Sequence, residues 1–250
     1  MKIGFYMADS RYGQYLADVE SYTSFTFCEA ETKGDYWYHK TKRQFIKALQ
    51  RAKDHGLKIH LNLQDTDPAK VVKLAAPVWD AVELIDVCDE PKLKLRAMTE
   101  RLVAIDDAIF AAGLRSKPIG AVFTASALRT LNGWRSAYLD WRGIEGYISP
   151  TFQHSKAAAV SEVKRVLREQ LDIIDDAKPI VVVGHANDSH GKWTNISTLV
   201  AVQHATYAVA AADKRVTHIR FFNWGREDGT RNHPELIAAH RAIAKKAGRA

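Results

Sequence analysis

The stretch from Ala81 to Pro91, AVELIDVCDEP, ends on two adjacent carboxylates, Asp89 and Glu90, followed by a proline. The apolar residues before the acids are typical of a buried strand. The residues after them, KLKLRAMTERLVAIDDAIFAAG, favour a helix. A strand that ends in acids and leads into a helix places those acids at the carboxyl end of a parallel sheet. In α/β proteins this is the end that carries the chemistry.

Seven other segments repeat this order of strand, polar exit and helix. Their strands are expected at residues 2–8, 21–31, 57–65, 118–125, 144–152, 178–188 and 216–229. The polar residues at the expected strand ends are Asp9, Glu29, Glu31, Asp65, Asp89, Glu90, His154, His185, Asp188, Asn223 and Glu227, with Asp228 just beyond. Helices are expected at 13–20, 41–55, from Asp67-Pro68, up to Gly113, after a cap at Ser126, and at 156–177, 197–215 and 233–248.

Eight strand–helix units of about thirty residues in a chain of 250 residues predict a single (β/α)8 TIM barrel over residues 1–250. The connections alone would also allow an open doubly wound sheet, but eight units favour closure. The glycine-rich dinucleotide fingerprint and the phosphate-binding Walker loop are both absent from the sequence. No linker or change in composition indicates a second domain.

Composition limits the partners. The net charge is +7, but Lys and Arg are spread along the expected helices rather than gathered in one run, which is typical of solvated helix faces and predicts no nucleic-acid partner. The two cysteines, Cys28 and Cys88, form no spacing motif for a disulfide scaffold or a zinc site. Met1 leads directly into a strand-like segment, and no apolar run approaches the ~18 residues that span a bilayer. We expect a cytoplasmic protein without membrane partners, a monomer or small homo-oligomer, with release by lysis or non-classical export left open.

Polar residues also fall inside the expected strands. His60, Asn62 and Gln64 share one face of their strand, and Asp86 shares a face with Cys88 and Glu90 if no bulge intervenes. His218 and Arg220 share a face with Phe222 and Trp224. An outer face packed under helices would penalise such groups, so they are expected to point into the barrel. Asp86 and Arg220 can compensate each other in the core, or can serve with His60 as the pocket of another barrel enzyme, such as a lyase, an aldolase or a metal-assisted hydrolase.

The residues at the strand ends exclude several chemistries. No HExxH motif or similar metal spacing occurs, and His185, Asp188 and His190 are close in sequence without matching one, so neither metal nor cofactor is expected. A serine nucleophile would need a GxSxG turn, which is missing. Two carboxylates with aromatic neighbours fit glycoside hydrolysis, in which one protonates the leaving oxygen and the other attacks the sugar or activates water.

Three short pieces resemble the clan of retaining glycosidases on (β/α)8 barrels, the cellulase and β-galactosidase kind. IDVCDEP is similar to the clan's Asn-Glu-Pro strand ending, which implies that Glu90 is the acid/base and that Asp89 takes the Asn position. IEGYISPTFQHS resembles the clan's strand with a Tyr-Pro-aromatic exit and contains Tyr147. FFNWG resembles the clan's last strand, whose terminal Trp forms the floor of the sugar subsite; here that residue is Trp224.

The chain departs from the clan at strand seven. There the run Lys-Pro-x-x-x-x precedes the nucleophilic Glu, whereas here Lys178-Pro179-Ile180-Val181-Val182-Val183 precedes Gly184. Glycine can neither attack nor activate, so another carboxylate must act: Asp188 first, then Glu29 or Glu227. A separation of ~5 Å from Glu90 would indicate retention of configuration, and ~6.5–9.5 Å inversion. If no second carboxylate is in place, the barrel binds sugar without cleaving it.

The resulting hypothesis is a glycosidase that hydrolyses an oligo- or polysaccharide. Its catalytic residues are Glu90 and Asp188. Its substrate-binding residues are Asp89, Trp224, Asn223, Tyr147, Trp37, Trp193, Asn62, Asp65 and His185. The alternatives are a catalytically inactive carbohydrate-binding barrel and a non-glycosidase enzyme that uses the Asp86/Arg220 pocket.

Overall fold

A computed structural model describes residues 1–6, 15–29, 41–63, 66–89, 95–130, 137–185, 193–222 and 230–248. For Glu29, Cys88, Asp89 and Leu95 it describes the backbone only.

Eight parallel strands form a closed barrel in sequence order, and the last strand pairs with the first. The strands are β1 (Lys2–Tyr6), β2 (Phe25–Glu29), β3 (Lys58–Asn62), β4 (Val82–Asp89), β5 (Ile119–Phe123), β6 (Trp141–Glu145), β7 (Ile180–His185) and β8 (Val216–Phe222). The (β/α)8 barrel predicted from the sequence is confirmed. All eight carboxyl ends therefore meet at one end of the barrel.

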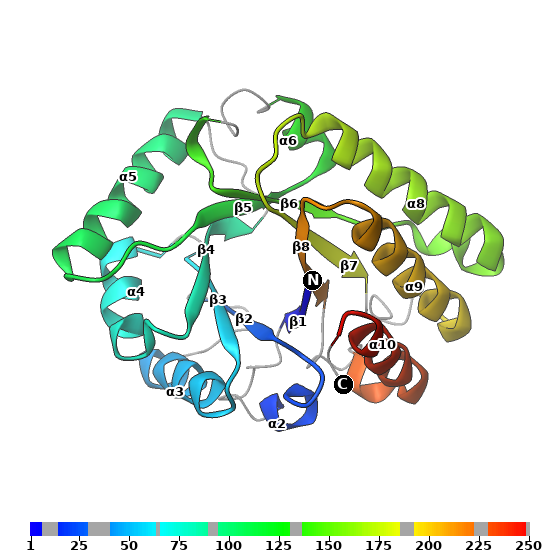
Figure 1. Cartoon of the computed structure of the whole chain (residues 1–250), viewed down its shortest axis with the longest axis horizontal. Helices are drawn as coiled ribbons and strands as arrows, with labels where there is room; N and C mark the ends of the chain where they lie inside the picture. Colours follow the sequence, from blue (N-terminus) through cyan, green and yellow to red (C-terminus); the bar gives the residue numbers. More distant parts are fainter. Residues whose placement is uncertain are drawn as a thin grey trace.

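Helices surround the barrel in the order of the chain (Figure 1). They are α2 (Leu16–Val19), α3 (Lys42–Asp54), α4 (Pro68–Ala75), α5 (Leu95–Ala111), α6 (Ala125–Thr130), α8 (Lys156–Ile173), α9 (Ile196–Ala212) and α10 (Pro234–Lys246). Short 3-10 helices are η1 (Ala76–Val78), η2 (Pro150–His154) and η3 (Thr230–Asn232). Within the described segments, no helix combines the length and apolar character needed to cross a membrane.

The helix boundaries follow local signals in the sequence. Thr41 caps α3 with a capping box, in which its hydroxyl accepts from the Gln44 backbone N–H and the Gln44 side chain accepts from the Thr41 N–H. Asp67 caps α4, with Pro68 at the first helical position. Gly56 follows α3 at φ +68°, a conformation that favours glycine. Each of these ends agrees with the sequence prediction.

Several predicted boundaries are wrong, among them the start of the second strand at Phe25 and the end of α8 at Ile173, and two further ones lie near the site. The sixth strand runs from Trp141 to Glu145 rather than over 144–152, so Tyr147 lies just beyond its end. Ser126 lies inside α6 rather than at its cap, and the hydroxyl of Thr124 accepts from the Ala127 N–H instead. In both places the pairing of the neighbouring strand, not the local sequence pattern, decides where the element begins.

The barrel interior holds its own apolar layer, the inner cluster. It consists of Tyr6, Phe27, Leu84, Val122, Trp141, Val181 and Val183, with Tyr147 and Phe222 packed against it. A larger core lies between the strands and the helices. Gly120 leaves the space that the Trp141 ring occupies in the barrel interior, because a Cβ on Gly120 would overlap that ring. Burial of a side chain of this size contributes about 1.5–3 kcal/mol.

Three shifts of register interrupt the barrel. Between β3 and β4, Ile59 pairs with Val82 and His60 with Leu84, which leaves Glu83 as an extra residue. A second shift on β4 lies between Asp86 and Asp89, against β5. On β8, Thr217 is the extra residue between the pairs that Val216 and His218 make with β7. Bulges of this kind re-aim side chains and are common near functional sites.

Candidate active site

Asp86 and Arg220 form a bidentate ion pair across the barrel interior. Arg220 donates from Nη1 to Asp86 Oδ1 at 2.5 Å and from Nη2 to Oδ2 at 2.8 Å, and from Nε to His60 Nδ1 at 3.0 Å. All three side chains are 0% exposed. The guanidinium lies 4.9 Å from the Phe27 ring centroid and 5.0 Å from that of Trp141.

The sequence left two roles open for this pair, and its geometry supports the structural one. Burial raises the pKa of Asp86, and the charge and hydrogen bonds of Arg220 act in the opposite direction. Arg220 donates one hydrogen bond to each oxygen of the carboxylate, and neither side chain reaches solvent. The two charges therefore neutralise each other inside the core, as expected of a buried pair with complete geometry.

Aromatic and imidazole rings gather where β6, β7 and β8 end. Tyr147 contacts His185 edge-on at 5.5 Å between centroids and lies 6.2 Å from Phe222. His185 contacts Trp193 edge-on at 5.4 Å. Three residues predicted as sugar contacts, Tyr147, His185 and Trp193, thus lie in one cluster. Tyr147 is half-buried, whereas His185 is 5% exposed and Trp193 1%.

Gln153 of η2 holds the segment that carries Trp193. Its Oε1 accepts from the backbone N–H of Thr194 at 2.7 Å and of Asn195 at 3.2 Å. These bonds tie the segment after β6 to the start of α9. Trp193 in this position packs edge-on against the His185 ring, and its own ring is buried.

Asn62, also predicted as a sugar contact, is the last residue of β3 and is 0% exposed. It pairs in register with Asp86 on one side and with Glu29 on the other. It lies within the barrel, level with the ion pair.

Gly184 faces the helix layer. A Cβ on Gly184 would meet the Phe221 ring at 2.9 Å and Cγ2 of Thr206, on α9, at 3.3 Å. Its neighbour Val183 belongs to the inner cluster, so by alternation His185 is the inward residue at the end of β7. The place where the resemblance would put a nucleophile thus has no acid on the barrel side of β7 itself, and His185 is the group that faces the mouth.

The bulge on β4 affects the predicted acids. The alternation that would put Asp86, Cys88 and Glu90 on one face holds only without a bulge, and the structure has one between Asp86 and Asp89. Asp89 pairs with Val122, which belongs to the inner cluster. The condition on which the shared face of Asp86, Cys88 and Glu90 was predicted is therefore not met, and the side chains of Cys88 and Glu90 lie outside the described residues.

Several predicted site residues lie outside the described residues. They are Glu90, Asp188, Trp224, Asn223, Trp37 and Asp65, together with His190 and Glu227. Their roles, and the separation of Glu90 from a second carboxylate, stay predictions.

Sequence reasoning missed one inward acid, Glu83. It stands in an alternating pattern that would direct it to the helices, and only the register shift against β3 turns it inward. No residue pattern in the sequence signals that shift.

Comparison with known proteins reveals likeness of fold without likeness of sequence. No protein-family model matches the chain, and no curated protein matches it. A GH113 β-1,4-mannanase superimposes with a TM-score of 0.64 at 12% identity, over 98% of this chain and 97% of that one. Xylanase 10B from Thermotoga maritima gives 0.61 at 11% identity, over 99% and 95%. The β-glucuronidase of Ruminococcus gnavus gives 0.58 at 12%, over 98% of this chain and 50% of that one.

Proposed function

We propose that this chain is a glycoside hydrolase that cleaves β-linked oligo- or polysaccharides. Its barrel resembles those of a β-1,4-mannanase, a xylanase and a β-glucuronidase over nearly its whole length. The observation that carries the proposal is that β4 ends at Asp89, the residue before Glu90 in the sequence, at the carboxyl end of a barrel with this fold. That end holds the active sites of (β/α)8 enzymes.

The proposed roles follow from carboxylate chemistry. Glu90 donates a proton to the leaving oxygen and later removes one from water, and Asp188 is the second carboxylate. The neighbouring charge of Asp89 favours the protonated form of Glu90, as a general acid requires. Tyr147 and His185 contribute ring contacts at the mouth, beside the proposed sugar contacts Trp224, Asn223, Trp37 and Asp65.

Replacing Glu90 tests the proposal. Wild-type protein is assayed on β-mannan, xylan and aryl β-glucuronides, and the best substrate is kept. Glu90→Gln keeps the side-chain volume but cannot transfer the proton, so kcat is expected to fall by about 10²–10⁴-fold. The matched control is Glu100→Gln, at an exposed position of α5 where the carboxylate pairs with Arg96 at the surface. Full activity of Glu90→Gln on a natural substrate would refute the assignment.

The second carboxylate is identified by a matched series. Asp188→Asn, Glu29→Gln and Glu227→Gln are compared on the same substrate, and Asp188→Asn is expected to lose the most activity. NMR of the first anomer released separates retention from inversion, which in turn bounds the distance between the two carboxylates. Equal activity of all three variants would leave Asp188 without a role.

A second function, sugar binding without cleavage, is favoured by one observation. β7 carries no acid at Gly184, and its inward residue at the mouth is His185. Calorimetry with manno- and xylo-oligosaccharides, combined with product analysis, distinguishes the two. Binding without any product would support the inactive barrel, and product formation that depends on Glu90 would exclude it.

A further inference from the structure

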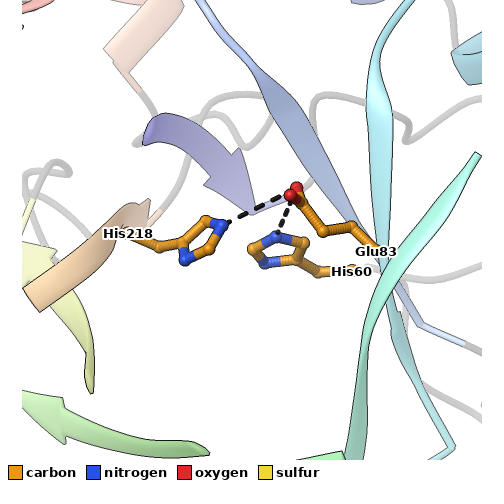
Figure 2. A group of neighbouring side chains, drawn as sticks. All are labelled: His60, Glu83 and His218. Carbon is orange, nitrogen blue, oxygen red and sulfur yellow. Dashed lines mark ion pairs between the residues drawn. The ribbon is translucent and has the colours of Figure 1, made fainter. Parts of the chain in front are cut away.

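Two histidines and one glutamate converge at the amino-terminal end of the barrel, opposite the proposed active site. We propose that His60, Glu83 and His218 bind a divalent transition-metal ion, with Zn²⁺ as the best match (Figure 2). His60 is the third residue of β3, Glu83 the second of β4 and His218 the third of β8. Strand starts far apart in the sequence thus supply one compact group.

The distances suit a metal ion. Nε2 of His60 and Nε2 of His218 each lie 3.6 Å from Oε2 of Glu83. All three atoms lie within 4.8 Å of one another. Zn²⁺ holds nitrogen and oxygen ligands at about 2.0–2.2 Å, which places two ligands of a tetrahedral ion about 3.4 Å apart. A small inward movement of the side chains therefore completes the site.

The same three atoms are buried and without hydrogen-bond partners. Nε2 of His60, Oε2 of Glu83 and Nε2 of His218 are each covered from solvent, and none makes a hydrogen bond to a residue in the described part of the chain. Buried polar atoms in folded proteins are nearly always satisfied, and an unsatisfied group points to an ion or a water. Three such atoms aimed at one point, two of them imidazole nitrogens, indicate a shared ligand.

A β-bulge brings Glu83 into the group. Without the register shift between β3 and β4, Glu83 would alternate outward beside the inward Leu84. Two adjacent residues of β4, Glu83 and Leu84, instead both face the interior. Lys2 of β1 pairs with Oε1 of Glu83, which fixes the carboxylate and leaves Oε2 directed at the two rings.

Thr217 holds the His218 ring through its Nδ1. The Thr217 hydroxyl lies 3.4 Å from the Ile180 carbonyl, which can only accept, and 2.8 Å from Nδ1 of His218. When the hydroxyl donates to the carbonyl it accepts from Nδ1–H, and the lone pair of His218 is then on Nε2, as the proposed site requires. This hydrogen bond is the outer-shell arrangement that orients metal-binding histidines. Thr217 is itself a bulge residue.

His60 is oriented by Arg220 and by Phe25. Arg220 Nε donates to Nδ1 at 3.0 Å, which assigns the proton of the neutral ring to Nε2. The ion replaces that proton, which leaves to solvent, and the imidazolate is stabilised by Arg220 on its other nitrogen. With the Glu83 carboxylate, the site then offers two negative charges to the divalent ion. The Phe25 ring stacks on His60 at 3.7 Å and holds its plane.

The histidines carry no positive charge that would repel a cation. Burial, then the charges of Arg220 and Lys2, lower the pKa of His218 to about 3. The pKa of His60 is also lowered, by burial first and then by Arg220. Of the neighbouring cations, Arg220 pairs with Asp86, and Lys2 pairs with Oε1 of Glu83.

A cavity at the same end of the barrel gives access. Its volume is about 820 Å³, and Lys2, Leu84, Trp141, Thr217 and His218 are among the residues that line it. Lys2 and His218 belong both to the cavity wall and to the site, so the cavity is the route for the ion. Three protein ligands leave a fourth position for water or a small anion from the cavity.

Metal analysis of the full chain tests the proposal. Protein freed of metal by chelation is dialysed against Zn²⁺, and elemental analysis is expected to find one equivalent bound. Co²⁺, as a spectroscopic substitute for Zn²⁺, is expected to give the strong visible bands of a four-coordinate nitrogen–oxygen site. No retained ion, or Co²⁺ bands identical to those of the hydrated ion, would overturn the proposal in favour of a bound water.

Matched variants separate this site from surface binding. Glu83→Gln keeps the shape and is expected to weaken Zn²⁺ binding at least about 100-fold, because loss of an outer-shell partner alone costs 10–100-fold. Thr217→Val removes the positioning contact and is expected to weaken it about 10–100-fold. The control, His55→Gln, disrupts the surface pair of His55 with Glu20 and should leave one equivalent bound.

Folding and catalysis are controlled independently. Zn²⁺ is expected to raise the melting temperature of the wild type and of Glu90→Gln, but not that of Glu83→Gln. Circular dichroism shows whether Glu83→Gln is folded. Thr217→Val gives a second comparison of Zn²⁺ binding with the wild type, in a variant whose charge is unchanged. Equal Zn²⁺ affinity in wild type and both site variants would overturn the assignment, whatever the glycosidase assay gives.

Discussion

His218 and His240 show how burial sets the charge of single residues in this barrel. Burial is the main reason that the pKa of each ring falls from 6.5 to about 3. His240 of α10 stacks on Phe221 at 4.3 Å and lies 4.7 Å from Phe5, and neither of its nitrogens has a hydrogen-bond partner. Both rings are therefore neutral in the folded protein at pH 7 and charged in the unfolded chain below about pH 6.5.

The sign of the pH dependence follows. A lowered folded-state pKa means that the unfolded chain binds more protons below pH 6.5, so stability is complete above pH 6.5 and falls towards pH 3. Each such histidine contributes a loss of up to about 1.4 kcal/mol per pH unit. His240→Phe is expected to reduce this slope by one proton and, by removing two unsatisfied nitrogens, to stabilise the fold at pH 7 by about 1 kcal/mol.

Urea unfolding between pH 7.5 and 4.5, with a chelator present, measures both effects. Phe110→Leu, at an exposed position without a titratable group, serves as the control and should keep the wild-type slope. A slope in His240→Phe equal to that of the wild type would contradict the pKa assignment.

At the scale of elements, β3, β4 and β8 carry the polar interior through His60, Asp86 and Arg220. β3 and β4 are consecutive strands, whereas β8 is distant from both in sequence, and the ion pair joins residues 134 positions apart. Closing the barrel is what brings them together. The pair therefore links opposite halves of the sheet, and its loss should affect the whole barrel.

The ion pair is tested by a double-mutant cycle. Asp86→Asn leaves the Arg220 charge buried without its carboxylate and is expected to destabilise the protein by about 3–5 kcal/mol. Asp86→Leu combined with Arg220→Met removes both charges and is expected to recover much of that loss. Chemical denaturation measures each variant. A single variant no worse than the double one would show that the pair is not compensated as described.

The contact between β5 and β6 gives a second test at this scale. Gly120→Ala would overlap the Trp141 ring, so we expect a loss of about 1–3 kcal/mol from overpacking. The matched control is Gly146→Ala, whose Cβ would meet only the end of the Leu167 side chain, at 3.2 Å. Thermal unfolding compares the two. Equal effects would mean that the barrel interior relaxes around Trp141.

At the scale of the whole molecule, the two ends of the barrel have different chemistry. The proposed sugar site lies at the carboxyl ends of the strands, and the proposed metal site at their amino ends. The Asp86–Arg220 pair and the inner cluster lie between them. Ligands at the two ends are therefore separated by packed core, and each can be lost without the other.

The compact loops expected from the sequence predict an open cleft and cleavage within a polymer. Time-resolved product analysis on the preferred β-glycan is expected to show a range of oligosaccharides early in the reaction, with a rapid fall in viscosity. Exclusive release of monosaccharide from chain ends would contradict this prediction.

The amino-acid sequence alone sufficed for the closed barrel, the order of its strands, and helix ends such as Thr41, Gly56 and Asp67-Pro68. These depend on local hydrophobic period, capping and chain length, which the sequence carries directly. It also sufficed to place Asp86, Arg220 and His60 inside the barrel. A polar side chain that faced the apolar helix layer would be buried without a partner, so the barrel interior is the direction of lower free energy.

Tertiary structure alone decided the register. The start of β6 at Trp141, the outward direction of Gly184 and the inward direction of Glu83 all depend on how a strand pairs with its neighbours. One extra residue in one of two paired strands reverses the face of every residue beyond it in that strand. Such a bulge produces no hydrophobic period by which the sequence would reveal it. For that reason the group of His60, Glu83 and His218 emerged only once the eight strands had closed.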